Sequence, residues 1–356
     1  MSSVVISGDT SGAITLAAPT VAGTNTITLP AVTGTMALTA GQIGMKNRFI
    51  NGAMVIDQRN AGASVTNAVS TSQYCLDRWN MSSSVASKYT VQQNAGSVTP
   101  PVGFNNYLGV TSLSAYAVAS TDYFRISQSI EGFNFADLGF GTANAKTVTA
   151  SFWVRSSLTG TFGGHLINGT GTRIYPFTYT ISSANTWEQK SVTIAGDTTG
   201  TWSIDNSTGA LLGFSLGYGS SLSGTANAWN AGTASMPTGA TSVVGTSGAT
   251  WYITGVQLEL GSAATTFDFR DYGRELILCQ RYYETSGSAT IVCGFSRSDG
   301  VILVPVYFAV DKRTTPTVTF STILTATYIG TRGCAGNATY GASSAYSASF
   351  IATSEL

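Results

Sequence analysis

The sequence predicts an all-β chain built from four consecutive parts. These are an N-terminal extended β segment (residues 1–45), a central jelly-roll β-sandwich (46–261), a connector with a short helix (262–285) and a small C-terminal β domain (286–356). Two observations carry this prediction. Short runs of residues alternate between apolar and polar side chains, and Gly- and Asn-rich stretches separate them. Only one stretch is helical in character.

Residues 1–45 are a low-complexity tract of Ala, Gly and Thr. The tract holds two β-type pieces, "AITLAAP" and "TITLPAV", and each ends at a proline. Pieces this short cannot form a core of their own. We expect the segment to become ordered only against partner chains, and therefore to attach the protein to a larger assembly.

The central part is all-β by pattern. In "TVTASFWVRS", one face of the strand carries the apolar residues Val148, Ala150, Phe152 and Val154. The same alternation recurs in "YFRISQSI", "WEQKSVTIAG", "LLGFSLGYG" and "TWYITGVQLEL". Between such runs lie turns such as "NGTGT" and "GDTTGT", where Gly and Asn accept positive φ at low cost. Many short strands separated by turns predict a sandwich or jelly roll.

The stretch "ELILCQRYYE" (residues 275–284) contains no Gly or Pro and predicts a short helix that ends at "TSGS". Spacings of four, three and four residues, typical of a coiled-coil seam, relate Tyr272, Leu276, Cys279 and Tyr283. A helix of about three turns is marginal alone, so it must pack on something. Two partners remain open: the sandwich of its own chain, or two further copies of the helix around an axis.

After the helix the β pattern resumes in "SATIVCGFSRSDGVILVPVYFAV", where Asp299-Gly300 is a good hairpin turn. The stretches "TPTVTFSTILTATYIG" and "SSAYSASFIATSEL" supply further short strands. We therefore expect a second, smaller β unit.

Charge and cysteine content narrow the possible partners. Lys plus Arg equals Asp plus Glu at 17 each, so no net field favours nucleic acid as a partner. With no signal-peptide pattern and no run near the roughly 18 apolar residues of a membrane helix, we expect a soluble, cytosolically made protein without membrane insertion. The irregular spacing of the cysteines favours free thiols: Cys75, Cys279, Cys293 and Cys334.

No catalytic motif is present in the sequence. His165 is expected to be a loop residue without a catalytic role. Nothing resembles a P-loop or a G-x-S-x-G elbow, so no cofactor and no metal site are assigned, and a structural calcium ion would need oxygens distant in sequence. A glycosidase or lyase would need two carboxylates, and the candidates are Glu131, Asp137, Glu188, Asp197 and Asp205. The sequence brings no two of them together, so we expect no enzyme.

Aromatic residues of the central part are candidates for binding carbohydrate, because apolar sugar faces stack on rings while nearby polar groups bond the hydroxyls. The alternative for each ring is a place in the core. Trp153 and Arg155 share the face opposite Phe152, whereas Trp202 and Trp229 lie in Gly-, Thr- and Asn-rich loops. The candidate binding residues are Trp153, Arg155, Trp202, Trp229 and Tyr175.

Four stretches together resemble a family of tailed-bacteriophage tail proteins that includes tail fibres and receptor-binding proteins. They are "NRFINGAMVIDQRN" (47–60), "YCLDRW" (74–79), "KTVTASFWVRSSLTGTFGG" (146–164) and "WYITGVQLELGSAATTFDFRDYGRELILCQRYYE" (251–284). The later "AVDKRTTPTVTF" and "ATSEL" are also similar to that family, and the opening tract is similar to segments that begin other phage tail proteins.

The resemblance implies a carbohydrate-binding-module-like jelly roll, a homotrimeric fibre, attachment to other virion proteins through the N-terminal segment, and host recognition by the distal part. It implies no catalytic residues. In such a trimer the predicted helix would form a neck, with Tyr272, Leu276, Cys279 and Tyr283 facing the axis. Pairing between chains would then involve Glu275, Arg281 and Glu284.

The expected function is that of a phage virion protein, made in the bacterial cytoplasm and located in the virion tail. It would recognise a host surface polysaccharide or lipopolysaccharide without catalysis. Two alternatives remain: a purely structural tail adaptor or head fibre, and a polysaccharide depolymerase.

Overall fold

The computed structural model describes residues 3–7, 13–17, 45–232, 234–287, 295–296, 301–321, 324–339 and 348–356. The chain divides into two units, Met1–Gly41 and Gln42–Leu356. In the first unit, β1 (Ser3–Ser7) pairs antiparallel with β2 (Ala13–Ala17). Strand β2 is the predicted piece "AITLAAP", β1 has no counterpart among the predicted pieces, and "TITLPAV" lies outside the described residues.

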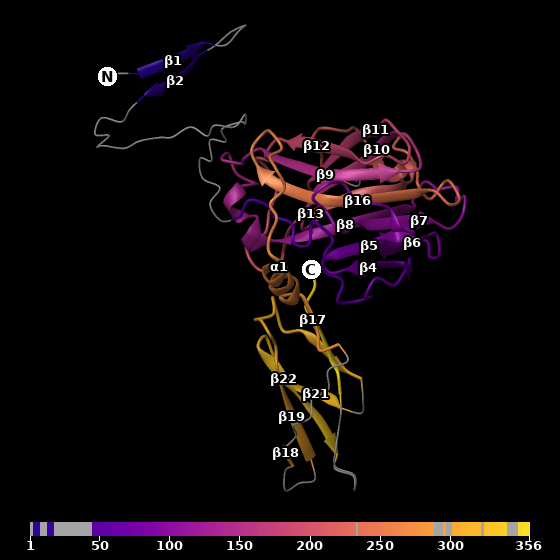
Figure 1. Ribbon diagram of the computed structural model, residues 1–356, viewed down its shortest axis with the longest axis vertical. Coiled ribbons are helices and arrows are strands. Elements are labelled where there is room, and N and C mark those ends of the chain that lie inside the picture. The colour runs from indigo at the N-terminus through magenta and orange to yellow at the C-terminus, as the bar shows by residue number, and fades with distance from the viewer. Residues whose placement is uncertain are drawn as a thin grey trace. The chain divides into compact units, whose positions relative to one another are not determined.

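The second unit begins with two antiparallel six-stranded sheets, each named here after a central strand (Figure 1). The β8 sheet has the order β11-β10-β13-β8-β5-β4, with bounds β4 (Ser70–Leu76), β5 (Trp79–Ser83), β8 (Tyr123–Glu131), β10 (Gly160–Asn168), β11 (Ile174–Ile181) and β13 (Thr208–Tyr218). The β9 sheet has the order β12-β9-β16-β7-β6-β3, with bounds β3 (Val65–Thr66), β6 (Tyr89–Gln93), β7 (Leu108–Ser112), β9 (Val148–Ser156), β12 (Glu188–Ile194) and β16 (Thr250–Leu260).

Short elements connect these strands. They are 3-10 turns at Ala95–Ser97, Gly132–Asn134, Ala136–Leu138 and Ser220–Leu222, and the parallel pair β14 (Ser223–Gly224) and β15 (Met236–Pro237). The pair β14 and β15 belongs to a long connection between β13 and β16, which reaches the outer face of the β8 sheet through contacts with β10 and β11.

The main hydrophobic core lies between the two sheets and confirms the predicted alternation. The inward residues of β9, which include Phe152, are fully buried. The Phe152 ring meets Tyr179 and Phe214 of the other sheet edge to face, with ring centroids 5.0 and 4.9 Å apart. Because both sheets turn a continuous apolar face inward, burial of these faces is the main force that holds the sandwich together. The all-β prediction is therefore confirmed.

The predicted helix exists but occupies different residues. Helix α1 (Tyr272–Gln280) begins at the N-cap Asp271, whose carboxylate accepts the Arg274 backbone N–H. It ends before Tyr283, which belongs to β17 (Tyr283–Thr285). The prediction that the helix extends to residue 284 is wrong, because the chain there pairs with β23 (Phe350–Thr353) instead.

The seam residues do not share one face turned toward a symmetry axis. Cys279 is buried among Ile50, Ile56 and Tyr282 of its own chain, and Leu276 packs against the same cluster. Tyr272, by contrast, is 64% exposed. A side chain already enclosed by its own chain cannot face a partner, so the predicted seam is wrong for Cys279 and Tyr283, and α1 packs on its own chain there.

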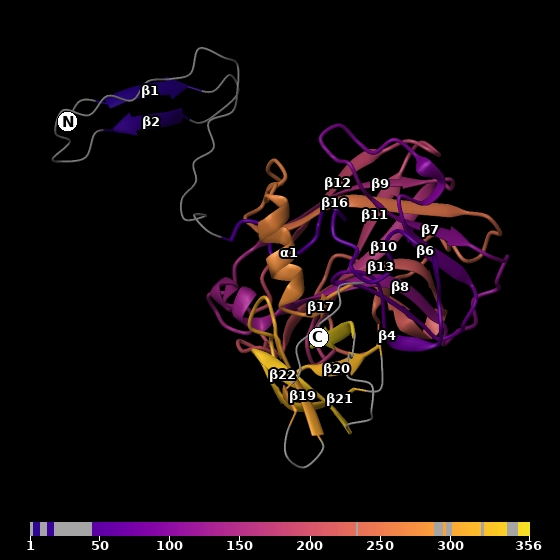
Figure 2. The same cartoon turned by 60° about the horizontal axis from the view of Figure 1, so that its bottom comes forward.

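The predicted C-terminal β unit (residues 286–356) contains most of two small sheets (Figure 2), but β17 (Tyr283–Thr285), just before the predicted boundary, also belongs to one of them. One has the order β17-β23-β20, and the other β18-β19-β22-β21; the remaining bounds are β18 (Phe295–Ser296), β19 (Val301–Tyr307), β20 (Thr317–Phe320), β21 (Thr325–Gly330) and β22 (Gly333–Thr339). Strands β18 and β19 pair antiparallel, and the predicted turn Asp299-Gly300 between them lies outside the described residues.

Buried ion pairs connect the C-terminal β unit to the sandwich. Glu355 accepts from Arg59 and from Arg78, and Glu131 accepts from Arg281 at 2.6 Å. Glu284 pairs with Lys312. Arg281 and Glu284, predicted to pair between chains, are therefore paired within the chain, as is Glu275 with Arg270 at 3.4 Å.

Candidate functional site

A groove of about 400 Å³ lies on the outer face of the β8 sheet. Its floor is a cross-strand row in which Ser129 of β8 faces Leu211 of β13, Leu211 faces Ile167 of β10, and Ile167 faces Ile174 of β11. These residues alternate with core residues along their strands, so their side chains stand on the outer face. The groove therefore has an apolar floor with one hydroxyl.

The walls of the groove combine polar residues with Leu222 and Leu356. They are formed by Arg125 of β8, by the β10–β11 turn with Asn168, by Thr208, by Leu222 and Ser235 of the β13–β16 connection, and by Leu356. Arg125 is the only charged side chain among the described lining residues. Its guanidinium lies near the Tyr218 side chain, while its Nε is buried without a hydrogen-bond partner.

His165 supports one wall of this groove. The prediction of a loop residue is wrong: His165 lies in β10 and is fully buried, because "TFGGHLING" continues a strand in spite of its glycines. Its Nδ1 lies 2.8 Å from the Ser235 carbonyl oxygen and must donate to it, which holds that wall over the sheet. Burial lowers the pKa of His165 to about 3, and the positive charge of Arg125 acts in the same direction. His165 is therefore neutral at physiological pH.

The backbone beside His165 has no room for a side chain. A Cβ atom on Gly213, opposite His165 in the sheet, would lie 2.4 Å from Nε2 of the imidazole. Only glycine at position 213 lets this buried imidazole pack flat against β13.

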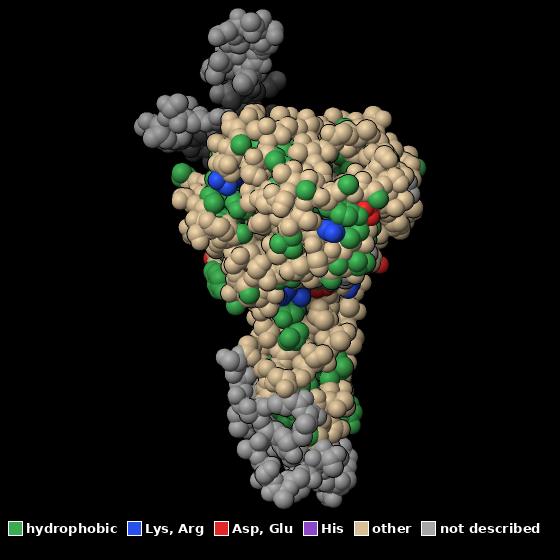
Figure 3. Space-filling model, turned by 90° about the vertical axis from the view of Figure 1, so that its right-hand side faces the viewer, with side chains coloured by type: hydrophobic (Ala, Val, Ile, Leu, Met, Phe, Trp, Pro, Cys, Tyr) green, Lys and Arg blue, Asp and Glu red, His purple; other side chains and the backbone are tan. Residues whose placement is uncertain are grey.

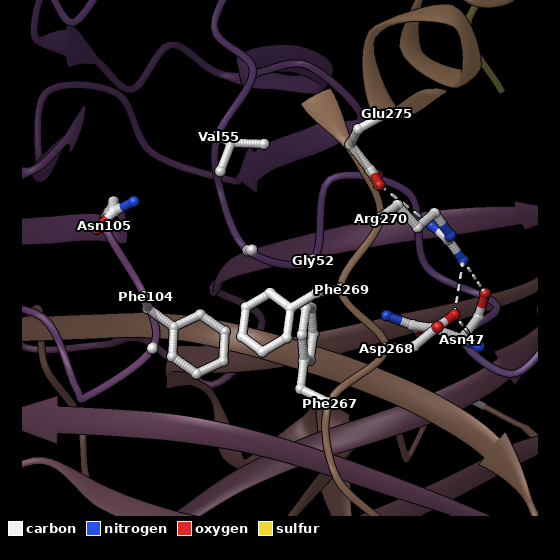
Figure 4. Close-up of a pocket in the computed structure, with 12 residues that line it drawn as sticks. Asn47, Gly52, Val55, Phe104, Asn105, Phe267, Asp268, Phe269, Arg270 and Glu275 are labelled. Atoms are coloured by element: carbon white, nitrogen blue, oxygen red, sulfur yellow. Dashed lines mark hydrogen bonds and ion pairs between the residues drawn. The ribbon is translucent and has the colours of Figure 1, made fainter. Parts of the chain in front are cut away.

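A second, smaller pocket of about 100 Å³ lies beside the N-terminal end of α1 (Figure 4). Phe104, Phe267 and Phe269 pack against one another there, with ring centroids 4.8 to 5.1 Å apart. Arg270 reaches from the same segment toward Glu275, and donates to the backbone oxygen of Phe49 at 2.9 Å. The polar groups are engaged by each other, and the volume is below the roughly 300 Å³ typical of ligand pockets. We interpret this pocket as a packing junction.

Three of the predicted carbohydrate-binding residues form one cluster at an end of the core. Trp202 is 7% exposed and stacks on Phe135, with ring centroids 5.4 Å apart. Tyr175 is also 7% exposed, and Trp229 contacts both rings edge to face while its indole N–H donates to the Ala195 carbonyl oxygen. The prediction is wrong for Trp202, which other aromatic rings enclose, and for Tyr175, because a ring that is 7% exposed offers little surface to a sugar.

Trp153 and Arg155 lie on the outer face of the β9 sheet, as predicted, and away from the groove. Arg155 Nε donates to the Asn185 carbonyl oxygen at 3.0 Å. The neighbouring Tyr252 is almost fully buried, because Tyr107 and Trp187 cover it. The structure thus brings the five predicted residues to two different places, and neither is the groove.

The five candidate carboxylates are all engaged in separate interactions. Glu131 pairs with Arg281, Asp137 with Arg48, Glu188 with Lys190 and Asp197 with Arg173, while Asp205 accepts from Ser207. Among the described residues, no group of three or more His, Cys, Asp or Glu side chains could hold a metal ion. The described cysteines, Cys75, Cys279 and Cys334, are free and buried.

No helix in the described ranges is long and apolar enough to span a membrane. Charged side chains are sparse on the face of the molecule drawn in Figure 3, where hydrophobic side chains are scattered among polar ones. This surface agrees with the low charge of the sequence, in which 10% of residues are charged.

Comparison with known proteins finds distant similarity of structure alone. No protein-family profile and no curated protein sequence matches the chain. Among solved structures, the enzymatically active domain of tailspike protein 4 of bacteriophage CBA120 is 12% identical with a TM-score of 0.30, and the match covers 52% of this chain and 19% of that one.

Two other structures have similar scores. A protein of Bacteroides thetaiotaomicron assigned to sugar binding is 11% identical with a TM-score of 0.36, covering 61% of this chain and 100% of that chain. The family 11 carbohydrate-binding module from Clostridium thermocellum is 11% identical with a TM-score of 0.28, covering 56% and 96%. These likenesses are too distant to assign a function to this chain.

Proposed function

We propose that the chain is a receptor-binding protein or tail fibre of a tailed bacteriophage, and that it binds a host surface polysaccharide or lipopolysaccharide without catalysis. The observation that carries glycan binding is the groove on the β8 sheet. The placement in a phage tail is supported by the ordered sequence blocks that resemble phage tail proteins.

The groove has the composition that a sugar requires. Its volume of about 400 Å³ lies within the range of ligand sites. The row Leu211, Ile167 and Ile174 offers an apolar surface to the C–H face of a sugar ring, while Ser129 and Thr208 offer hydroxyls at its edge. Such a site recognises one sugar unit or a few, and it brings no pair of carboxylates to the glycosidic bond.

We further propose that the protein is a homotrimer and that residues 1–45 attach it to other virion proteins. The short β1–β2 hairpin has too few strands for independent stability, which supports ordering against a partner. Deletion of residues 1–40 is expected to leave a folded trimer that no longer joins particles. Normal incorporation of the truncated chain would contradict the attachment.

Filling the groove tests the glycan proposal. Ser129→Tyr places a ring on the floor of the groove, and Ser191→Tyr makes the same change on the exposed outer face of β12 in the other sheet. We expect Ser129→Tyr to abolish adsorption to host cells and to arrayed bacterial polysaccharides, while Ser191→Tyr binds like wild type.

Three other results would contradict parts of the proposal. Equal binding by both variants would exclude the groove as the site. A wild-type protein that binds no cell or glycan would favour the purely structural component. A fall in polysaccharide molecular weight on incubation with the protein would favour the depolymerase.

A further inference from the structure

The groove presents a positive charge that has no carboxylate partner. Most arginines of the described chain pair with a carboxylate, as Arg173 does with Asp197 at 2.6 Å. None of the ion pairs among the described residues includes Arg125. No Asp or Glu side chain occurs among the described residues that line the groove. A chain with few charges thus keeps one cation in this groove.

The strand register explains why Arg125 stands alone. Its neighbours across the sheet are Ser82 on β5 and Ser215 on β13, both short and neutral. In the next row, Ser127 faces Gly213 and Gly213 faces His165. None of these side chains can neutralise a guanidinium. Arg125 thus has only neutral neighbours across the sheet, and it lines the groove.

Unpartnered hydrogen-bonding atoms gather at the same place. The Arg125 Nε–H and the Ser127 and Ser82 hydroxyls are all buried without a hydrogen-bond partner. A buried guanidinium N–H normally has an acceptor, because leaving it unpaired is costly. The Tyr218 side chain lies near the guanidinium, and among the described residues no carboxylate pairs with it. His165 adds no competing charge, since it is neutral and its Nδ1–H is used by Ser235.

We propose that the groove binds an anionic glycan, with Arg125 receiving a carboxylate or phosphate group of the sugar. A planar guanidinium matches either anion with two parallel charge-assisted hydrogen bonds. The sugar ring that carries the anion then lies over Leu211 and Ile167. This inference rests on the proposed function and specifies its ligand class: an acidic polysaccharide or a phosphorylated lipopolysaccharide, in preference to a neutral glycan.

The test uses the full-length protein and an array of purified bacterial polysaccharides, acidic and neutral. A polysaccharide that binds is retested after carboxyl reduction and, separately, after dephosphorylation, and the treatment that removes binding identifies the anion. Loss of a charge-assisted contact is expected to weaken binding about 10- to 100-fold. Binding should also weaken as salt is raised.

Variants assign the effect to one residue. Arg125→Gln is expected to bind the native and the charge-removed glycan equally weakly, and Arg125→Lys to keep part of the preference. The matched control is Arg155→Gln on the outer face of the other sheet, which should keep the preference of wild type. Thermal unfolding of each variant verifies that it is folded, and Arg125→Lys remains informative if Arg125→Gln is not.

The outcomes separate this inference from the proposed function. If the protein binds glycans through the groove but prefers neutral ones, or is indifferent to carboxyl reduction and dephosphorylation, the anionic class is wrong and the glycan-binding function stands. If it binds no glycan of the array, the proposed function itself fails.

Discussion

Glu355 is the residue whose loss should most weaken the connection between the C-terminal β unit and the sandwich. Its carboxylate receives two guanidinium groups, from Arg59 at 2.5 Å and from Arg78. The Arg78 side chain is 1% exposed and its guanidinium lies over the Tyr282 ring, 3.6 Å from the centroid. Glu355→Gln keeps the size of the side chain and removes the negative charge.

The expected cost follows from this burial. Removing one partner of a buried ion pair costs about 3–5 kcal/mol, because the other charge remains buried and unpaired. Glutamine still accepts a hydrogen bond, so we expect the lower end, about 3 kcal/mol. With an unfolding entropy of about 2.1 cal/mol/K per residue over the unit Gln42–Leu356, the melting temperature should fall by roughly 4–5 °C.

Thermal unfolding followed by circular dichroism measures this change. The control is Asp311→Asn, the same chemical change at a pair with Arg332 whose side chains are 57% and 83% exposed. An exposed pair contributes about 0–1 kcal/mol, so the control should shift the melting temperature little. Equal shifts for the two variants would refute the argument that burial makes Glu355 important.

Three further predictions concern pH, the core and assembly. Burial raises the pKa of Asp77 to about 6, so the folded state holds this proton more tightly than the unfolded state. Stability should therefore fall by about 3 kcal/mol as pH rises from about 4 to 6, and Asp77→Asn should remove this slope from urea unfolding curves. Trp202→Ala should lower the free energy of unfolding by about 3–5 kcal/mol and leave the glycan affinity of the folded protein unchanged. A loss of glycan affinity in the folded variant would indicate that Trp202 contacts the glycan. Light scattering of the wild type should give three times the 36.9 kDa chain mass, and a monomer would contradict the trimer. Ile277 is 53% exposed on α1, so Ile277→Asp should dissociate the trimer. Leu276→Asp should mainly lower the thermal stability.

The strands of the sandwich were predictable because a two-residue period leaves a direct trace in the sequence. In β9 every second residue, from Val148 to Val154, is apolar, and all four of these residues are fully buried in the core. Strand β10 was missed because His165 stands among glycines, which signal a turn. There the glycines serve packing: Gly213 and Gly164 leave no space for a side chain beside His165 and Phe177.

The candidate site was not predictable from aromatic residues. A tryptophan in a polar loop can turn inward, as Trp202 does when it stacks on Phe135, and local composition does not reveal this. A usable signal was present in β8, whose polar face carries Arg125 as its one basic residue and ends at Glu131, which pairs with Arg281. Its meaning depends on neighbours in β5 and β13, strands remote in sequence, which supply serine and not a carboxylate.

The role of helix α1 follows from the residues it buries. Glu275 accepts from the backbone N–H of Asn51 and pairs with Arg270, while Cys279 is enclosed by Ile50 and Ile56. The helix thus fixes the segment after residue 45 against the sandwich. Immediately beyond it, Arg281 pairs with Glu131 of β8. The contact between residues 47–56 and the helix explains why the chain places a helix between two β units: the helix joins the start of the sandwich to the start of the C-terminal unit.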